Sequence, residues 1–517
     1  MRIGVDVGGT NTDAVLLAGK EVLGAVKRPT SADVSTGISD AIGALISECN
    51  IRPDEITAVM IGTTHFTNAF IQRRELVPVY ALRVGFPAGR GIPPFSSWPE
   101  DLKETVCGGS AMVPGGFEFD GREISPLDES AISNAIFEAR KKGISQIAVS
   151  CIFSQLNPDH ENRVFKMIGD QAPEMEVSLS SELGRVGLLE RENAAIMNAS
   201  LRPLAAKITA AFKRALHEQG ITAPFYISQN DGTLMSADYM QRYPVMTFAA
   251  GPTNSIRGAA WLTGAEDAIV VDIGGTTSDV GVLKGRFPRQ STVHVDVGGV
   301  RTNFRMPDIL SIGLGGGSLV RSDKGKVTVG PDSVGYRLLS EGLIFGGDTL
   351  TASDIAVAGG QISFGEPERV ADLSPALVSQ AREAIKDLIA DAVDRMKTMP
   401  GDIPMILVGG GSVIVSETPL GVSEMLHPQH AGVANAIGAA IGQVSGEVDR
   451  IYNIANPDER VRALADAEAQ AKTHAISAGA QSDSIKIVNI EAVPLQYLPG
   501  GATRVVCRAV GDLAMME

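Results

Sequence analysis

The chain of 517 residues contains one ten-residue pattern twice, as GVDVGGTNTD at residues 4–13 and as VVDIGGTTSD at residues 270–279. Each copy is an apolar strand that ends in Asp, a Gly-Gly-Thr turn and a second Asp. A single turn of this kind can simply close a hairpin between two strands. Two copies matched over this length are difficult to explain in that way. They predict two related domains that each supply half of one site.

The residue types in these turns favour phosphate binding. Glycine lets the backbone approach an anion closely, and its N–H groups can point at phosphate oxygens. A bare carboxylate at a strand end would repel phosphate, so Asp6 and Asp272 are candidate Mg²⁺ ligands and catalytic groups. Asp13 is a further catalytic candidate, which could orient water or cap the turn that follows. The candidate phosphate contacts are Gly8, Gly9, Thr10, Asn11, Thr12, Gly274, Gly275, Thr276 and Thr277.

Composition argues against several classes of protein. The net charge of −15 argues against a nucleic-acid partner, because phosphate-backbone binding needs clustered Lys and Arg. No apolar run approaches the roughly 20 residues of a membrane helix, and the N-terminal MRIGVDVGG enters a strand at once, so no signal peptide is expected. The four cysteines lie far apart with no CxxC pair, which favours reduced thiols and a cytoplasmic location.

Alternating strand and helix patterns predict an α/β protein. Residues 86–125 are rich in Gly and Pro, which predicts irregular or inserted structure there. Strands are expected at 404–411 and in the tail after about residue 484. Helices are expected over residues 35–49, 65–74, 190–219, 249–264, 375–397 and 432–442.

The paired turns resemble the two phosphate motifs of the actin, sugar-kinase and heat-shock-chaperone ATPases. In that superfamily VGGGS at 408–412 would be the adenosine motif, with Gly409, Gly410 and Gly411 beneath the nucleotide, and residues 432–442 would be a connecting helix. The resemblance implies two actin-like (ribonuclease H-like) domains with a nucleotide cleft between them and a small C-terminal segment of strands. The expected boundaries are 1–185, 186–480 and 481–517.

Further motifs resemble those of the hydantoinase A/5-oxoprolinase family, in order from about residue 1 to 445. The chain departs from the family pattern in two ways that bear on the choice of substrate. Residues 332–347 replace a stretch that is usual in the family, and no hydantoinase B region is recognised. Smaller differences lie inside the motifs, where Asp231 replaces a glycine. The matching motifs are GTTHFTNAFIQRR (62–74), RENAAIMNASLRP (191–203), SQNDGTLMS (228–236), AAGPTNSIRGA (249–259, family pattern SGPAGGVxGA), SIGLGGGSL (311–319) and HAGVANAIGA (430–439, family pattern AGVxSAxGA).

Members of that family use ATP to act on lactams, hydantoins or ketones. The resemblance therefore implies ATP and Mg²⁺ as cofactors, a cyclic amide as substrate, an oligomer, and a second enzyme subunit that could complete the reaction. His65, on a strand-end turn, is a candidate catalytic base. An ATP-dependent ketone carboxylase subunit, a small-molecule kinase and an ATP-driven regulator remain open as alternatives. The candidate substrate contacts are Thr64, Asn68, Asn230 and Asp231.

Overall fold

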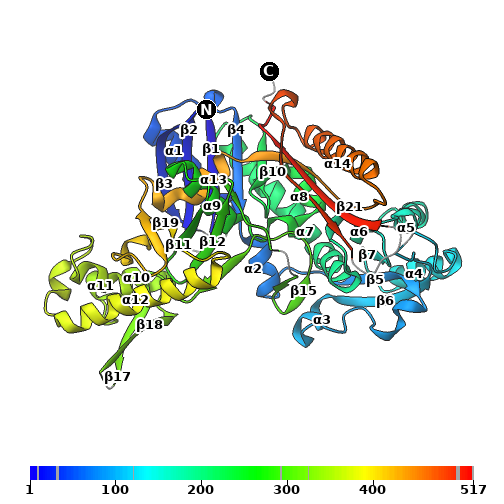
Figure 1. Ribbon diagram of the computed structural model, residues 1–517. Coiled ribbons are helices and arrows are strands. Elements are labelled where there is room, and N and C mark those ends of the chain that lie inside the picture. Colours follow the sequence, from blue (N-terminus) through cyan, green and yellow to red (C-terminus); the bar gives the residue numbers. More distant parts are fainter. Residues whose placement is uncertain are drawn as a thin grey trace.

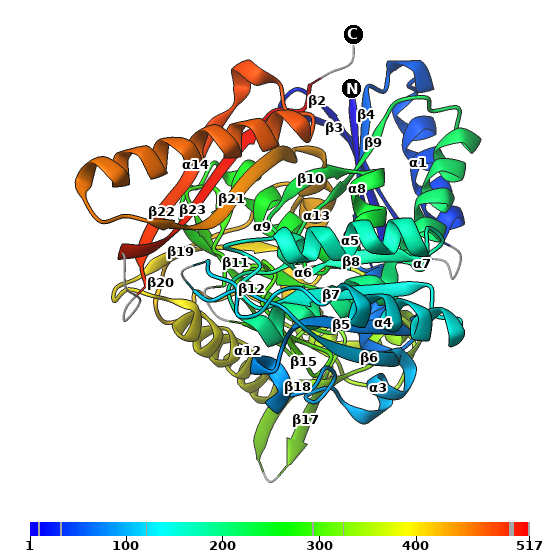
Figure 2. The same cartoon turned by 90° about the vertical axis from the view of Figure 1, so that its right-hand side faces the viewer.

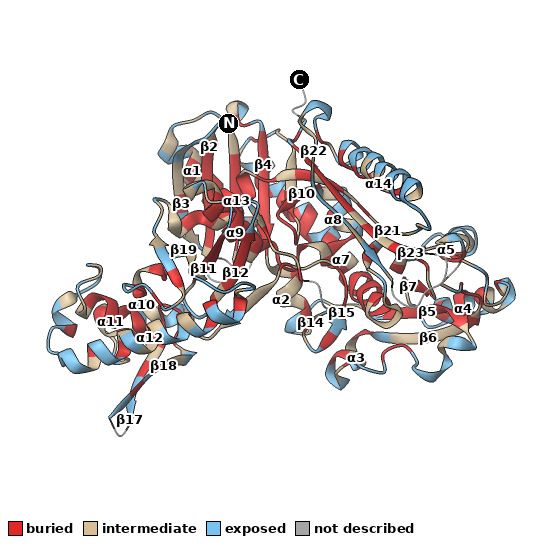
Figure 3. Cartoon of the chain, viewed as in Figure 1, coloured by how far each residue is buried: buried red, intermediate tan, exposed pale blue. Residues whose placement is uncertain are grey.

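The computed structural model describes residues 1–8, 11–30, 34–119, 121–291, 294–323, 325–495 and 501–514. It confirms the α/β class, with helices packed against several sheets (Figure 1). The buried residues gather in the central strands and in the helices between them, whereas the outer helices are exposed on one side (Figure 3). No helix among the described residues has the length and apolar character needed to cross a membrane.

Two sheets repeat the same strand order, which confirms the internal duplication. In each, a hairpin is followed by a strand parallel to its first member. The register is also repeated, because Asp6 pairs with Asp13 and Asp272 pairs with Asp279. The first set is β3 (Glu21–Pro29), β2 (Asn11–Ala18), β1 (Arg2–Val7), β4 (Ala58–Thr63) and β9 (Phe225–Ser228), and the second is β13 (Phe287–Pro288), β12 (Ser278–Lys284), β11 (Ala268–Ile273), β19 (Ile403–Val408) and β20 (Val422–Leu426).

Two helices lie between these sheets and cross at very short range: α9 (Ala250–Thr263) and α13 (Ala434–Ala440). A Cβ on Gly258 would stand 1.9 Å from the Ala434 carbonyl oxygen, and one on Gly438 would stand 1.8 Å from the Asn254 carbonyl oxygen. Real side chains never approach a backbone atom so closely. Glycine is therefore required at both positions, and the backbones of the two helices are in direct contact.

A third sheet, entirely parallel, lies beside the first: β6 (Cys107–Pro114), β5 (Val79–Phe86), β7 (Gln146–Cys151) and β8 (Glu176–Leu179). The prediction of irregular structure over 86–125 is wrong in part, because β6 and α3 (Glu100–Val106) lie within it. Glycine at position 108, in β6, allows close packing, because a Cβ there would stand 2.7 Å from the Ile144 side chain. The helices of this region are α4 (Glu129–Lys141), α5 (Asp159–Gln171) and α7 (Leu188–Glu218).

A buried ion pair joins this third sheet to α7. Arg83 donates two hydrogen bonds to Glu192, and both side chains are at most 3% exposed. Ser150 donates to the same carboxylate. Removing one partner of a buried pair leaves an uncompensated charge.

We expect Glu192→Ala to lower the free energy of unfolding by about 3–5 kcal/mol. Chemical denaturation monitored by circular dichroism measures this loss. Glu48→Ala is the control, because Glu48 pairs with Arg28 on the surface and exposed pairs contribute roughly 0–1 kcal/mol. Equal stability of the two variants would contradict the structural role of Glu192.

The C-terminal part extends the first sheet beyond β9 and β10 (Thr233–Ser236). Its strands are β21 (Gln443–Asn453), β23 (Ala502–Gly511) and β22 (Lys486–Pro494), and α14 (Pro457–Ser477) lies along one face of them (Figure 2). The alanines of α14 at positions 463, 467, 471 and 475 are buried against that face. The predicted domain boundaries at 185 and 480 stay a prediction.

The remaining elements surround this framework. The hairpin of β17 (Ser318–Asp323) and β18 (Lys326–Ser333) projects from the second sheet (Figure 1). The small hairpin of β14 (Val295–Val297) and β15 (Val300–Thr302) packs on α7. The other elements are α1 (Val34–Cys49), α2 (His65–Ile71), α6 (Ser180–Leu183), α8 (Ala237–Arg242), α10 (Leu338–Glu341), α11 (Ala352–Ala358), α12 (Pro375–Met396) and β16 (Ile309–Ile312).

Candidate functional site

The two predicted phosphate turns follow β1 and β11 and have the same internal hydrogen bond. Gly8 N–H donates to the Asn11 carbonyl at 3.0 Å, and Gly274 N–H donates to the Thr277 carbonyl at 2.9 Å. Gly9 and Thr10 lie outside the described residues. In the second turn Gly275, Thr276 and Thr277 are exposed, so their polar groups are accessible to a ligand, whereas Thr12 of the first turn is buried and contacts Thr30.

The carboxylates at the two strand ends lie close enough for the charge of Asp272 to act on Asp6. Burial raises the pKa of Asp6 to about 7, with further contributions from Asp13 and Asp272. Burial likewise raises the pKa of Asp272 to about 6. The only nearby cation among the causes of these shifts is Lys27, whose Nζ lies 2.8 Å from Asp13. The site therefore gathers carboxylates that share one cation, with Asp6 and Asp13 buried and Asp272 partly accessible.

Polar groups on the two crossing helices hold these carboxylates. Asn435 on α13 donates from Nδ2 to Asp6 at 2.9 Å and to Asp13 at 3.2 Å. Ser255 on α9 donates to Asp272 at 2.5 Å. The Oδ1 of Asp6 is buried and accepts no hydrogen bond within the described chain. An incompletely paired group of carboxylates suits a divalent cation with oxygen ligands.

No group of three or more His, Cys, Asp or Glu side chains in the described ranges is arranged to hold a metal by itself. A cation bound at Asp6 and Asp272 would therefore need water or phosphate oxygens as its other ligands. This is the usual coordination of Mg²⁺ at phosphate sites, where one or two carboxylates suffice. The residues present thus fit the predicted cation.

Asn254 is a site residue that the motif analysis did not single out. It lies on α9, is 1% exposed, and neither of its amide atoms has a hydrogen-bond partner among the described residues. A Cβ on Gly62 would stand 2.5 Å from Asp6 Oδ1 and 2.6 Å from Asn254 Nδ2. The unpaired Asp6 Oδ1 and Asn254 Nδ2 therefore both lie next to Gly62. The signal was present in the sequence, since Asn254, Ser255 and Asn435 replace Gly, Gly and Ser of the family patterns.

The predicted adenosine turn, Gly409 to Gly411, lies against the end of β11. Gly411 N–H donates to the Ile273 carbonyl at 2.7 Å. Gly409 has φ +84°, and a Cβ there would stand 2.2 Å from Asp272 Oδ1. Nothing would meet a Cβ on Gly410 within 4 Å. The turn thus lies against Asp272, the candidate metal ligand, and has open space next to Gly410.

The glycine-rich loop 312–318 supports the second phosphate turn from behind. Gly316 N–H donates to the Gly274 carbonyl at 3.0 Å, and Gly317 N–H donates to the Gly275 carbonyl at 2.8 Å. A Cβ on Gly315 would stand 2.6 Å from the Gly275 backbone. These glycines therefore fix the shape of the turn.

The predicted residues of the 62–74 motif begin at the carboxyl end of β4, next to the first turn. Thr64 N–H donates to the Val7 carbonyl at 3.4 Å, and Asn68 Nδ2 donates to the Thr64 hydroxyl at 3.3 Å. His65 Nδ1 lies 2.6 Å from the Thr63 hydroxyl. Burial lowers the pKa of His65, so its imidazole is neutral at pH 7 and can accept a proton. The catalytic and substrate roles stay predictions.

Asn230 and Asp231 have structural contacts. The Asn230 amide is 2% exposed and bonds to the backbone of Val245, Ala249 and Arg305. Asp231 accepts from Thr233 and lies 3.0 Å from Arg508; although burial opposes it, these partners lower the Asp231 pKa. Their contacts explain a tight turn, and their substrate role stays a prediction.

Family models identify the chain's relationships. The hydantoinase/oxoprolinase N-terminal region matches residues 2–171, and the hydantoinase/oxoprolinase model matches residues 191–366. The chain belongs to the hydantoinase/oxoprolinase family. This confirms the resemblance inferred from the motifs.

Known relatives and solved structures agree with the family. Caprolactamase subunit alpha of Pseudomonas jessenii is 28% identical over 362 residues, which cover 65% of this chain and 51% of the relative. Acetophenone carboxylase gamma subunit of Aromatoleum aromaticum is 26% identical over 423 residues, covering 75% and 57%. The chain thus spans little more than half the length of these relatives.

The structure of ATP-dependent caprolactamase from Pseudomonas jessenii superimposes with a TM-score of 0.79, at 21% identity, covering 99% of this chain and 88% of that one. Nucleotide-free acetone carboxylase gives 0.67 at 17% identity, covering 100% and 88%. These likenesses confirm the fold.

Proposed function

We propose that this protein is an ATP- and Mg²⁺-dependent enzyme, or the nucleotide-binding subunit of one, that opens a cyclic amide such as a hydantoin, 5-oxoproline or a related lactam. The observation that carries the proposal is the pair of matched Asp-x-Gly-Gly turns, whose carboxylates are held by the crossing helices α13 and α9 and lie close enough to interact electrostatically. The caprolactamase and the 5-oxoprolinase among the relatives support the choice of a cyclic amide, and the ATP-dependent caprolactamase supports ATP.

In this proposal each part of the site has a separate role. Asp6 and Asp272 would hold Mg²⁺, while the glycine turns and the exposed Thr276 would bind the phosphates. When bound, Mg²⁺ neutralises phosphate charge and polarises the phosphoryl group that is transferred. His65, kept neutral by burial, would accept a proton from the attacking water.

The reaction would proceed by activation of the amide carbonyl. The γ-phosphoryl group of ATP passes to the carbonyl oxygen and ADP leaves. Water would then add to the activated carbon, and the ring C–N bond would break with a proton passing to the nitrogen, which leaves the open chain as an acyl phosphate. A second water would hydrolyse that acyl phosphate and release phosphate and the open-chain carboxylate. Activation is needed because amide resonance is strong, as its rotation barrier of about 18–20 kcal/mol indicates. Exclusion of water until phosphorylation would prevent waste of ATP.

The test is release of phosphate from ATP by the purified chain with Mg²⁺ and a panel of hydantoin, 5-oxoproline and simple lactams. We expect one ring compound to stimulate release and to appear as its ring-opened product. The double variant Asp6→Asn/Asp272→Asn serves as the blank. If MgATP fails to bind at all in calorimetry, the paired turns are not a nucleotide site and the proposal is wrong.

A ketone carboxylase subunit is the second candidate, favoured by the relative from acetophenone carboxylase. It predicts ATP turnover that needs a ketone and bicarbonate, whereas ring opening needs neither. The names of several relatives refer to subunits, so a second subunit belongs to both proposals. An oligomer and a cytoplasmic location are part of the proposal as well.

A further inference from the structure

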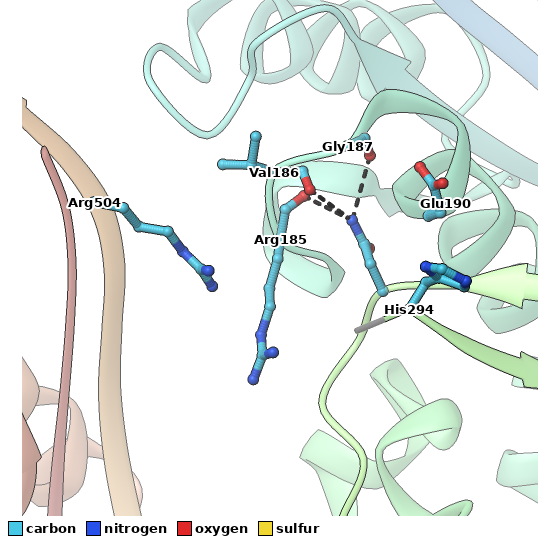
Figure 4. Close-up of a pocket in the computed structure, with 7 residues that line it drawn as sticks. Arg185, Val186, Gly187, Glu190, His294 and Arg504 are labelled. Atoms are coloured by element: carbon cyan, nitrogen blue, oxygen red, sulfur yellow. Dashed lines mark hydrogen bonds between the residues drawn. The ribbon is translucent and has the colours of Figure 1, made fainter. Parts of the chain in front are cut away.

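A second polar pocket lies at the start of α7, outside the predicted nucleotide site. Its volume is about 280 Å³, which is at the small end for pockets that hold ligands. The start of α7, the loop after β15 and strand β23 contribute its walls, as Figure 4 shows. The lining residues are Arg185, Val186, Gly187, Glu190, His294, Asn303 and Arg504.

One side of the pocket is cationic. The guanidinium group of Arg504 forms two hydrogen bonds to Asp449, at 2.8 and 2.5 Å. The Nε of Arg185 lies 3.9 Å from the same carboxylate, and this buried atom donates no hydrogen bond within the described chain. The charge of Glu491 also acts on both guanidinium groups. This side therefore presents two guanidinium groups to the pocket, with Asp449 and Glu491 as their counter-charges.

The opposite side carries acceptors. Glu190 lines the pocket near His294, on the side away from Arg504 (Figure 4). Its carboxylate is 26% exposed and lies 3.4 Å from Arg301. The Asn303 amide donates to the carbonyls of residues 185, 186 and 187, which fixes this wall. Asn303 is 9% exposed, and its Oδ1 accepts no hydrogen bond in the described part of the chain.

We propose that this pocket binds a free amino acid as its zwitterion, with the carboxylate beside Arg185 and Arg504 and the ammonium group beside Glu190. An anion alone would meet the Glu190 carboxylate as a like charge, although Arg301 lies beside it. A cation alone would meet the guanidinium groups of Arg185 and Arg504 as like charges. A small molecule with both charges satisfies the two sides together, because charge-assisted hydrogen bonds form at each end.

The pocket is connected to the candidate active site through the hairpin β14–β15. Arg73, two residues after the end of α2, donates to the Gly298 carbonyl at 3.0 Å, and α2 begins at His65. An amino acid is also the class of product that opening of a cyclic amide releases. That chemical link rests on the proposed function, whereas the pocket assignment rests on the geometry of the pocket.

Calorimetry on the whole chain without nucleotide tests the assignment. The probes are L-glutamate and 6-aminohexanoate, and the controls with one charge are hexanoate and hexylamine. We expect at least one zwitterion to bind at least tenfold more tightly than both controls. Equal binding of zwitterions and controls, or no binding of either zwitterion at 10 mM, would overturn the proposal.

Two variants locate the bound molecule. Arg185→Gln and Glu190→Gln remove one charge at each end with little change of shape, and each should weaken zwitterion binding about tenfold or more. Arg321→Gln, on the projecting hairpin, is the matched control and should bind like the wild type. Thermal melting checks that the variants fold. Unchanged affinity in both pocket variants would place the ligand elsewhere. These binding titrations contain no ATP. A failure of the ring-opening assay therefore does not count against this pocket, and a failure to bind the zwitterions does not count against the proposed ring opening.

Discussion

Replacing Asp6 by Asn should abolish MgATP binding and at the same time stabilise the ligand-free protein at pH 8. The Asn side chain keeps an acceptor for Asn435 but lacks the charge that a divalent cation requires. We expect the affinity for MgATP to fall at least about 100-fold, the loss of about 2.7 kcal/mol. Calorimetric titration with MgATP measures the first effect and thermal melting the second.

The gain in stability follows from the raised pKa of Asp6. Folding moves this pKa from 3.8 to about 7, so between these values the folded state binds more protons than the unfolded state. Stability therefore falls as the pH rises through this window, by about 2–4 kcal/mol in total. Asp6→Asn removes that loss. Its advantage over the wild type should be largest at pH 8 and should vanish near pH 4.

Asp54→Asn is the control for both effects, because Asp54 is an exposed carboxylate that pairs with Arg52 on the surface. It should change neither MgATP binding nor the melting temperature. If Asp6→Asn bound MgATP like the wild type, Asp6 would not be a metal ligand. If it melted at a lower temperature than the wild type at pH 8, the charge at position 6 would not be destabilising.

The second large effect is expected at the crossing of α9 and α13. Gly258→Ala would place a methyl group 1.9 Å from a carbonyl oxygen of the facing helix. Because the obstacle is backbone, no side chain can move aside and the helices must separate. We expect a loss of about 3 kcal/mol or more in the free energy of unfolding. Urea denaturation measures this loss.

Gly169→Ala on α5 is the matched control, since nothing lies within 4 Å of the added methyl group. Alanine is the better helix former, so this variant should be neutral or more stable by up to about 1 kcal/mol. Equal behaviour of the two variants would mean that the helices can separate at little cost.

The sequence predicted the duplicated turns and the two helices over residues 249–264 and 432–442, because these depend on short motifs with strict backbone requirements. It did not predict α14 or strand β6. In β6 glycine serves close packing rather than a loop, and a sequence does not distinguish these two uses. Asn254 and Gly62 lie far apart in the chain but close together in the fold. Such a contact arises only when the two helices are packed together.

The path of the chain makes the helix crossing the place where the two sheet-containing bodies are joined. The strands at both ends of the chain belong to one sheet, so the second sheet is topologically an insertion into the first body. The chain enters this insertion through α9 and returns through α13, and the two helices touch at Gly258 and Gly438. Both covalent connections thus pass through one pivot. Outside that pivot, the hairpin β14–β15 packs on α7 and Asn230 donates to the Arg305 carbonyl, so any rotation of the inserted body about the pivot has to break these contacts.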